Sequence, residues 1–224
     1  MFNNLTPVVK NLLIINVLVH VALLLLGDRI PELMDWFRLV KVNWLGFRTV
    51  GADGFYIENI RGIAVSTPTG PSDFRPLQIL THFFAHDTRG ILHILFNMLA
   101  LVFIGPAVEL AIGTRQFLNF YLFSGLFGGL LITLFDPSSI PVVGASGALS
   151  GVLVAFAILY PDQKMILFPV PVPIRARYVA MGLAGFSVLM VVFASHSGGV
   201  SHFGHLAGMI AAVVFFAARK FWTR

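Results

Sequence analysis

Four polar side chains lie inside hydrophobic stretches of this sequence, and they are the groups that could do chemistry there. His93 and Asn97 occur in "RGILHILFNMLAL", Ser146 in "VVGASGALSG" and His205 in "GVSHFGHLAGMIAA". An ionisable or amide side chain within a membrane span costs roughly 2 to 3 kcal/mol or more, so such a group marks a functional site by default. We therefore interpret these four residues as a candidate site.

A serine together with a histidine suggests acyl-transfer chemistry. The histidine can remove the hydroxyl proton and later return it to the leaving amine. His93 and Asn97 are four residues apart and share a helix face, so both could donate hydrogen bonds to an oxyanion, joined by backbone N–H groups at the start of the helix that contains Ser146. The chain has no cysteine, which excludes disulfides, thiolate metal sites and a cysteine nucleophile.

Membrane helices must position these residues. The chain has 224 residues, of which 57% are hydrophobic and 11% charged, whereas a soluble domain is roughly 25% charged. Stretches of about 20 apolar residues span the hydrocarbon core. We predict an all-α integral membrane protein, a single domain over residues 1–224, with a compact bundle of six transmembrane helices and a long structured outer loop at 28–88. The predicted spans are 8–27, 89–112, 114–135, 144–160, 176–195 and 200–218.

The basic residues predict the orientation of the chain. With both termini in the cytoplasm, the short outer loops 136–143 and 196–199 carry no Lys or Arg, as the positive-inside rule expects. The cytoplasmic basic residues are then Lys10, Arg115, Lys164, Arg175, Arg177, Arg219, Lys220 and Arg224. Spans two, four and six all run inward in this arrangement, so the four polar residues lie at similar depth near the outer face. We attribute the net charge of +5 to the chain's position in a membrane, and we expect no nucleic acid partner.

Small residues predict which helices touch. Gly147 and Gly151 in the fourth predicted span, and Gly204, Gly208 and Ala212 in the sixth, recur at intervals of four. This spacing lets two helix backbones approach closely. Close packing of these spans would bring Ser146 within hydrogen-bond reach of His205, and Gly144 with Gly147 would leave room for a substrate backbone.

Residues 74–212 resemble the rhomboid intramembrane serine proteases. The matching segments are "THFFAHDTRGILHILFNM", "GASG", "GHLAG" and "GPAVELAIG". The resemblance implies that Ser146 is the nucleophile, that His205 is the general base, and that His93, Asn97 and the backbone of Ser146 bind the oxyanion. It also implies structural roles for Glu109 and His86, beside the glycines Gly144, Gly147, Gly151 and Gly208.

The resemblance also implies a substrate and a location. Such a protein is expected to cleave transmembrane segments of single-span or multi-span membrane proteins near helix-destabilising residues, without a cofactor or metal. Its fourth helix is expected to begin partway down a water-filled cavity open toward the outer face. A six-span form is typical of the bacterial inner membrane. Most of the family carries an aromatic residue one turn after the nucleophile, where this chain has Ser150, and the support of His205 is therefore left open.

Other chemistries fit the sequence less well. His82 and His86 have metal-ligand spacing, but without a H-E-x-x-H motif we favour structural hydrogen bonding. His202 is a rival base, although its position one turn nearer the water favours a place at the cavity rim. A nucleophile elbow of the α/β-hydrolase kind is excluded because G-x-S-x-G is absent.

Two other functions remain open. A catalytically weak rhomboid relative could bind membrane clients without cleaving them, but such proteins lack the serine or the histidine, and this chain retains both. A proton-coupled transporter also uses intramembrane His and Asn. Transporters usually show an internal repeat or paired broken helices, and the sequence shows neither.

Overall fold

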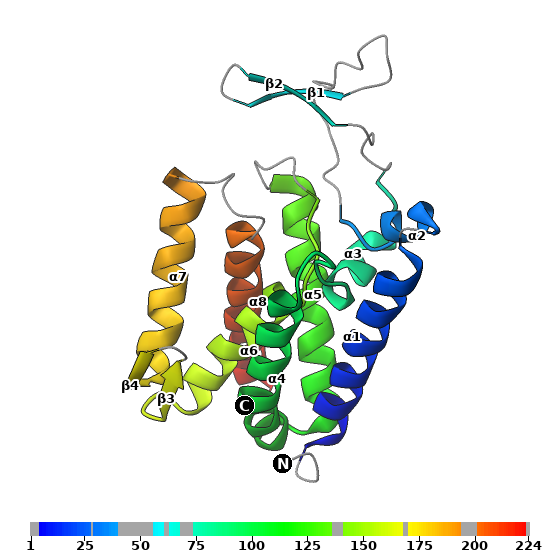
Figure 1. Ribbon diagram of the computed structural model, residues 1–224. Helices are drawn as coiled ribbons and strands as arrows, with labels where there is room; N and C mark the ends of the chain where they lie inside the picture. The colour runs from blue at the N-terminus through cyan, green and yellow to red at the C-terminus, as the bar shows by residue number, and fades with distance from the viewer. Residues whose placement is uncertain are drawn as a thin grey trace.

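Six apolar helices form the body of the molecule in a computed structural model, which describes residues 5–27, 29–39, 56–60, 63–67, 74–135, 141–167, 170–193 and 201–222. The six helices are α1 (Pro7–Leu26), α4 (Ile91–Ile112), α5 (Thr114–Phe135), α6 (Ser146–Leu159), α7 (Ala176–Phe193) and α8 (His202–Trp222). Figure 1 shows α1 beginning and α8 ending at the same end of the bundle, with α4, α6 and α8 running in the same direction. The predicted helical class is confirmed.

Short elements connect the long helices. The segment between α1 and α4 contains α2 (Pro31–Asp35), the antiparallel strands β1 (Tyr56–Ile60) and β2 (Ile63–Thr67), α3 (Gln78–Thr81) and the 3₁₀ helix η2 (His82–Phe84). A second antiparallel hairpin, β3 (Lys164–Leu167) and β4 (Val170–Arg175), joins α6 to α7. These hairpins lie at opposite ends of the bundle (Figure 1). The sequence did not predict these strands, and part of the predicted outer loop, at 28, 40–55, 61–62 and 68–73, lies outside the described residues.

Four of the described helices are long and apolar enough to cross a membrane: α1, α4, α5 and α7. The outside of the bundle is apolar, with Ile91, Leu110 and Phe193 exposed to 71, 76 and 75%, as expected for side chains facing lipid. The apolar part of α8 and the whole of α6 are shorter. With 14 residues, α6 rises about 21 Å, less than the roughly 30 Å hydrocarbon thickness. Six complete spans therefore remain a prediction.

Helix α6 lies at the centre of the bundle and contacts α4, α5, α7 and α8. Its buried side chains are mostly small or apolar, with Ala148, Val152 and Ala155 fully buried. Because α6 is enclosed by other helices, its polar first residue can be kept away from lipid.

Glu109 joins the start of α1 to the far end of α4. It is 1% exposed, and its carboxylate accepts hydrogen bonds from the backbone N–H groups of Val8, at 3.1 Å, and Val9, at 3.0 Å. These donors belong to the first turn of α1, where N–H groups have no partner within the helix and the helix dipole favours a negative charge. Glu109 thus caps α1 from another helix and fixes the two helices against each other.

Candidate active site

Ser146 and His205 are in hydrogen-bond contact. Oγ of Ser146, the first residue of α6, lies 3.0 Å from Nε2 of His205 in the second turn of α8. The two residues are 59 positions apart, so the tertiary packing of α6 against α8 creates this pair. A serine hydroxyl that donates to an imidazole nitrogen has the arrangement of a nucleophile beside its general base.

Glycines allow the close approach of α6 and α8. A β-carbon at Gly208 would stand 1.9 Å from the carbonyl oxygen of Gly147, and one at Gly151 would stand 2.8 Å from the carbonyl oxygen of Gly208. Both distances are shorter than any real β-carbon contact with backbone. The two helices therefore touch through backbone atoms, from the residue directly after Ser146 to about one turn further along each helix.

The turn before α6 requires glycine at position 144. Gly144 has φ of +128°, a conformation that residues with a β-carbon rarely adopt, and its N–H donates to the carbonyl oxygen of His82 at 2.9 Å. A β-carbon there would stand 2.8 Å from Nε2 of His93 and 3.8 Å from Oγ of Ser146. The missing side chain leaves open the space between the serine and His93.

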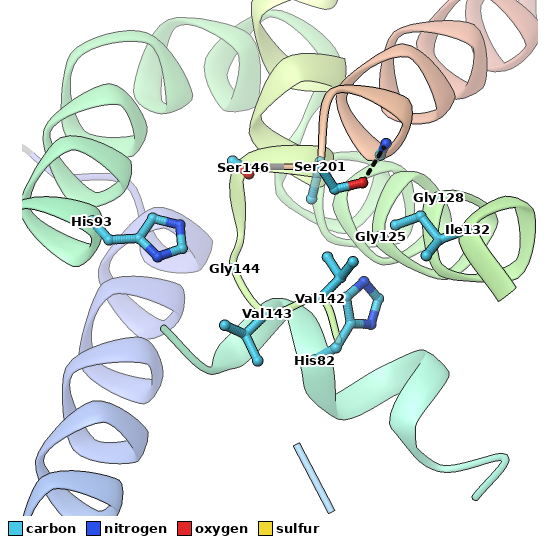
Figure 2. A pocket seen from close by; sticks show the side chains of 13 residues that line it. His82, His93, Gly125, Gly128, Ile132, Val142, Val143, Gly144, Ser146 and Ser201 are labelled. Atoms are coloured by element: carbon cyan, nitrogen blue, oxygen red, sulfur yellow. Dashed lines mark hydrogen bonds between the residues drawn. The ribbon is translucent and has the colours of Figure 1, made fainter. Parts of the chain in front are cut away.

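His93 points its Nε2 atom at this space. Its ring projects from α4 toward the chain at Gly144 (Figure 2), and its Nδ1 accepts a hydrogen bond from the backbone N–H of Asp87 at 3.3 Å. Because Nδ1 acts as the acceptor, the neutral imidazole carries its proton on Nε2. His93 therefore offers an N–H donor beside Ser146.

Asn97 lies one turn below His93 and is differently placed. Its Nδ2 donates to the carbonyl oxygen of His93 at 2.8 Å, and Asn97 is not among the residues that line the cavity at Ser146. One of its two amide hydrogens is thus engaged within α4. The structure therefore places His93 beside Ser146, whereas Asn97 lies one turn further along α4 and does not line the cavity.

Backbone donors also converge at the start of α6. Leu149 is the first residue whose N–H bonds back within this turn, to the carbonyl oxygen of Ala145 at 2.9 Å. The preceding N–H groups, including those of Ser146 and Gly147, have no acceptor within the helix. They lie beside the Ser146 hydroxyl, where an oxyanion formed by attack of that hydroxyl would need donors.

A cavity of about 20 Å³ opens at Ser146, which is enough for one water because a water requires about 10 to 15 Å³. Figure 2 shows Ser146, His93 and His82 around it, with Val142 and Val143 on the chain that leads to α6. The remaining lining residues are Gly125, Gly128, Ile132, Gly144, Gly147, Ala148, Ser201 and Gly204. Ser201 was not predicted as part of this site, although its position four residues before His205 places it on the same face of the predicted helix.

Most of this chain matches a known protein family. A family model described as the rhomboid domain matches residues 73–220, about two thirds of the chain, and covers both helices that carry the serine–histidine pair. The chain belongs to the rhomboid family. The structure and the family together make it a multi-pass membrane protein.

Three relatives of this rhomboid illustrate the range of the family. Rhomboid protease GluP of Bacillus subtilis is 33% identical over 130 residues, 58% of this chain and 23% of the relative. The mitochondrial rhomboid protein 1 of Saccharomyces cerevisiae is 33% identical over 145 residues, 62% of this chain and 40% of its own. An inactive rhomboid-related protein 2 of Caenorhabditis elegans is 31% identical over 127 residues, 56% of this chain and 36% of the relative. The chain thus spans less than half the length of these three relatives.

The loop that enters α4 in this rhomboid holds His93 in place. The Asp87 carboxylate accepts hydrogen bonds from the Arg89 backbone N–H, at 3.0 Å, and from its guanidinium, at 2.8 Å. The hydrogen bonds from the Arg89 side chain lower the pKa of Asp87 to about 2, so the carboxylate is ionised at neutral pH. This closed turn orients the Asp87 N–H that donates to His93.

His86 packs behind the same ring in the rhomboid site. The ring centroids of His86 and His93 are 5.2 Å apart at 71°, and His86 is 1% exposed. Burial lowers the pKa of His86 to about 3. His86 is therefore a neutral edge-on support for His93 at physiological pH. His82, whose spacing from His86 is that of metal ligands, has its Nδ1 3.0 Å from the carbonyl oxygen of Gln78.

The position of Ser150 in this rhomboid is also clear. Its Oγ donates to the carbonyl oxygen of Ser146, one turn earlier in α6, at 2.7 Å. The hydroxyl is used within its own helix, and a serine side chain is too short to stack on an imidazole. The support of His205 must therefore come from an element other than α6.

Proposed function

We propose that this rhomboid is an intramembrane serine endopeptidase with Ser146 as nucleophile and His205 as general base. The observation that carries the proposal is the 3.0 Å contact between Ser146 Oγ and His205 Nε2 beside a cavity with room for water. The relatives named as proteases are consistent with it. Because the chain spans only part of their length, the activity is inferred from this site.

In the acylation step, His205 takes the hydroxyl proton while Ser146 Oγ attacks the scissile carbonyl carbon. The carbonyl electrons move to oxygen, where the N–H groups of Ser146 and Gly147 and Nε2–H of His93 stabilise the charge. The C–N bond then breaks, and His205 gives its proton to the departing amine. An acyl-enzyme on Ser146 remains.

Deacylation reverses the proton transfers with water as the nucleophile. His205 takes a proton from a water in the cavity, and the hydroxide attacks the ester carbon. The bond between the acyl carbon and Ser146 Oγ breaks, the proton returns to Oγ, and a carboxylic acid leaves. The cavity at Ser146 provides a place for this water within an otherwise apolar bundle.

The proposed substrates are transmembrane segments of single-span or multi-span membrane proteins. We place the protein in a bacterial inner membrane with its termini in the cytoplasm and the cavity toward the outer face, because the basic residues predict this orientation. An extended substrate backbone could reach Ser146 over Gly144, where a β-carbon would block it.

The direct test uses the purified protein in liposomes with a fluorescent single-span substrate and, separately, with a fluorophosphonate probe. We expect a new peptide terminus within the substrate's transmembrane segment, and mass spectrometry should find the probe on Ser146. A folded protein that binds the substrate but neither cleaves it nor reacts with the probe would instead support a client-binding function.

The two candidate oxyanion side chains are expected to differ in importance. His93→Ala should lower kcat about 10² to 10³-fold, the usual cost of removing one oxyanion donor, because Nε2 of His93 faces the space beside Ser146. Asn97→Ala should lower kcat only about 10-fold, since Asn97 acts behind His93 through its bond to the His93 carbonyl. Steady-state kinetics on the same substrate would measure both, and equal kcat values for the two variants would contradict this ranking.

A further inference from the structure

The imidazole of His205 is held by a hydrogen bond at one nitrogen. Nε2 contacts Ser146 Oγ at 3.0 Å, whereas Nδ1 is buried and has no hydrogen-bond partner among the described residues. A single hydrogen bond fixes the position of one ring atom but leaves the plane of the ring free to turn about it. The orientation of the base must therefore depend on what packs against the ring.

His202 supplies that packing. It lies three residues before His205 in α8 and therefore on the same face of the helix. The two ring centroids are 5.8 Å apart and the planes are at 88°, the edge-to-face arrangement that imidazole and aromatic rings favour. Within the described part of the chain, this is the ring contact that His205 makes.

A neighbouring helix braces His202 in turn. Phe186 of α7 packs against the His202 ring with centroids 5.4 Å apart at 82°. The three rings of Phe186, His202 and His205 thus form a continuous edge-to-face stack from α7 to the general base. Ser150 cannot replace this stack, because its hydroxyl is bonded within α6.

We propose that His202 is a positioning residue for the general base. Its ring, braced by Phe186, fixes the plane of the His205 imidazole so that Nε2 faces the Ser146 hydroxyl. What His202 contributes is the shape of its ring, which packs edge-to-face against the ring of His205, and its Nδ1 makes no hydrogen bond among the described residues. This role rests on the proposed protease function and extends it to His202, which by sequence position is also a candidate for the base.

The test compares the wild-type protein with His202→Ala and His202→Phe in liposomes. His202→Ala should lower both kcat and the rate of fluorophosphonate labelling at Ser146 about 10 to 100-fold, the size of effect expected from a misaligned catalytic group, with KM changed less than about 2-fold. His202→Phe keeps a ring at this position and should stay within about 3-fold of the wild-type rates. Thermal unfolding of each variant shows whether the fold is retained.

Two results would overturn the positioning role. One is a folded His202→Ala protein with wild-type rates of labelling and cleavage. The other is a His202→Phe protein as slow as His202→Ala, because the imidazole nitrogens would then be what matters. Failure of the wild-type protein to label or cleave is a separate outcome, and it would overturn the protease function itself.

Phe186→Leu tests the same positioning role if His202→Ala does not fold. Phe186 is 53% exposed on α7, so Phe186→Leu should leave the bundle intact while removing the outer ring of the stack. We expect a loss in kcat and labelling rate of about 3 to 10-fold with unchanged KM. Wild-type rates in Phe186→Leu would show that α7 does not brace His202.

Discussion

Alanine at either Ser146 or His205 should reduce substrate cleavage to background, at least about 10³-fold below the wild-type rate. Ser146→Ala removes the atom that would form the acyl-enzyme, and His205→Ala removes the acceptor 3.0 Å from that hydroxyl. The fluorophosphonate probe separates the two effects. His205→Ala retains Ser146 but should label at least about 100-fold more slowly, because the serine is a poor nucleophile without its base.

Ser150→Ala is the matched control for this experiment. Ser150 lies one turn after Ser146 in the same helix, and its hydroxyl donates to a backbone carbonyl of that helix. Such a bond within a helix contributes little to stability, so cleavage and labelling should stay within about 3-fold of wild type. Undiminished cleavage by Ser146→Ala, or loss of cleavage in Ser150→Ala with the fold intact, would contradict the assignment of the nucleophile.

Gly208→Ala should disable the site without changing any residue that touches substrate. The new β-carbon would stand 1.9 Å from the carbonyl oxygen of Gly147, and this oxygen belongs to the backbone of α6 and cannot rotate away. The two helices must separate by about 1 Å or more, a displacement that can cost a catalytic site about 10²-fold in rate. Overpacking of this kind also destabilises a protein by about 1 to 3 kcal/mol. Cleavage assays and thermal unfolding measure the two effects.

Gly185→Ala provides the same substitution at an open position. Gly185 lies within α7, and nothing stands within 4 Å of the place where its β-carbon would be. Alanine is favoured over glycine in a helix by about 1 kcal/mol, so unfolding temperature and cleavage should be unchanged or slightly higher. If Gly208→Ala cleaves substrate as fast as Gly185→Ala, the close backbone contact between α6 and α8 is not needed for activity.

The helical class could be predicted from the sequence because lipid leaves a chain few options. Long apolar stretches can satisfy their backbone groups in a membrane only as helices or as a closed barrel, and α1, α4, α5 and α7 match the predicted spans closely. The hairpins β1–β2 and β3–β4 were not predicted, because they lie in connecting segments where no membrane constrains the backbone. The capping of α1 by Glu109 joins residues about a hundred positions apart, which no local pattern reveals.

Some features of the candidate site could likewise be predicted from the sequence, and others could not. Their types and their i, i+4 spacings were visible in the sequence, because a polar group inside an apolar stretch is costly and a helix places every fourth residue on one face. The difference between His93 and Asn97 was not visible. It depends on the turn at Asp87, whose N–H sets the tautomer of His93, and on the bond that keeps Asn97 behind the ring.

The apolar stretches and the polar residues within them were enough to predict a helical membrane protein that resembles the rhomboids. The same prediction placed a serine and a histidine on two helices whose glycines allow close contact. The folded bundle alone shows that Ser146 and His205 lie 3.0 Å apart, that Gly144 leaves space between Ser146 and His93, and that His202 packs against His205. The reason is that these contacts join residues that are far apart in the sequence. Composition and periodicity report what each helix can bury, whereas the distance between side chains on different helices is set by backbone contacts that form only when the whole bundle packs.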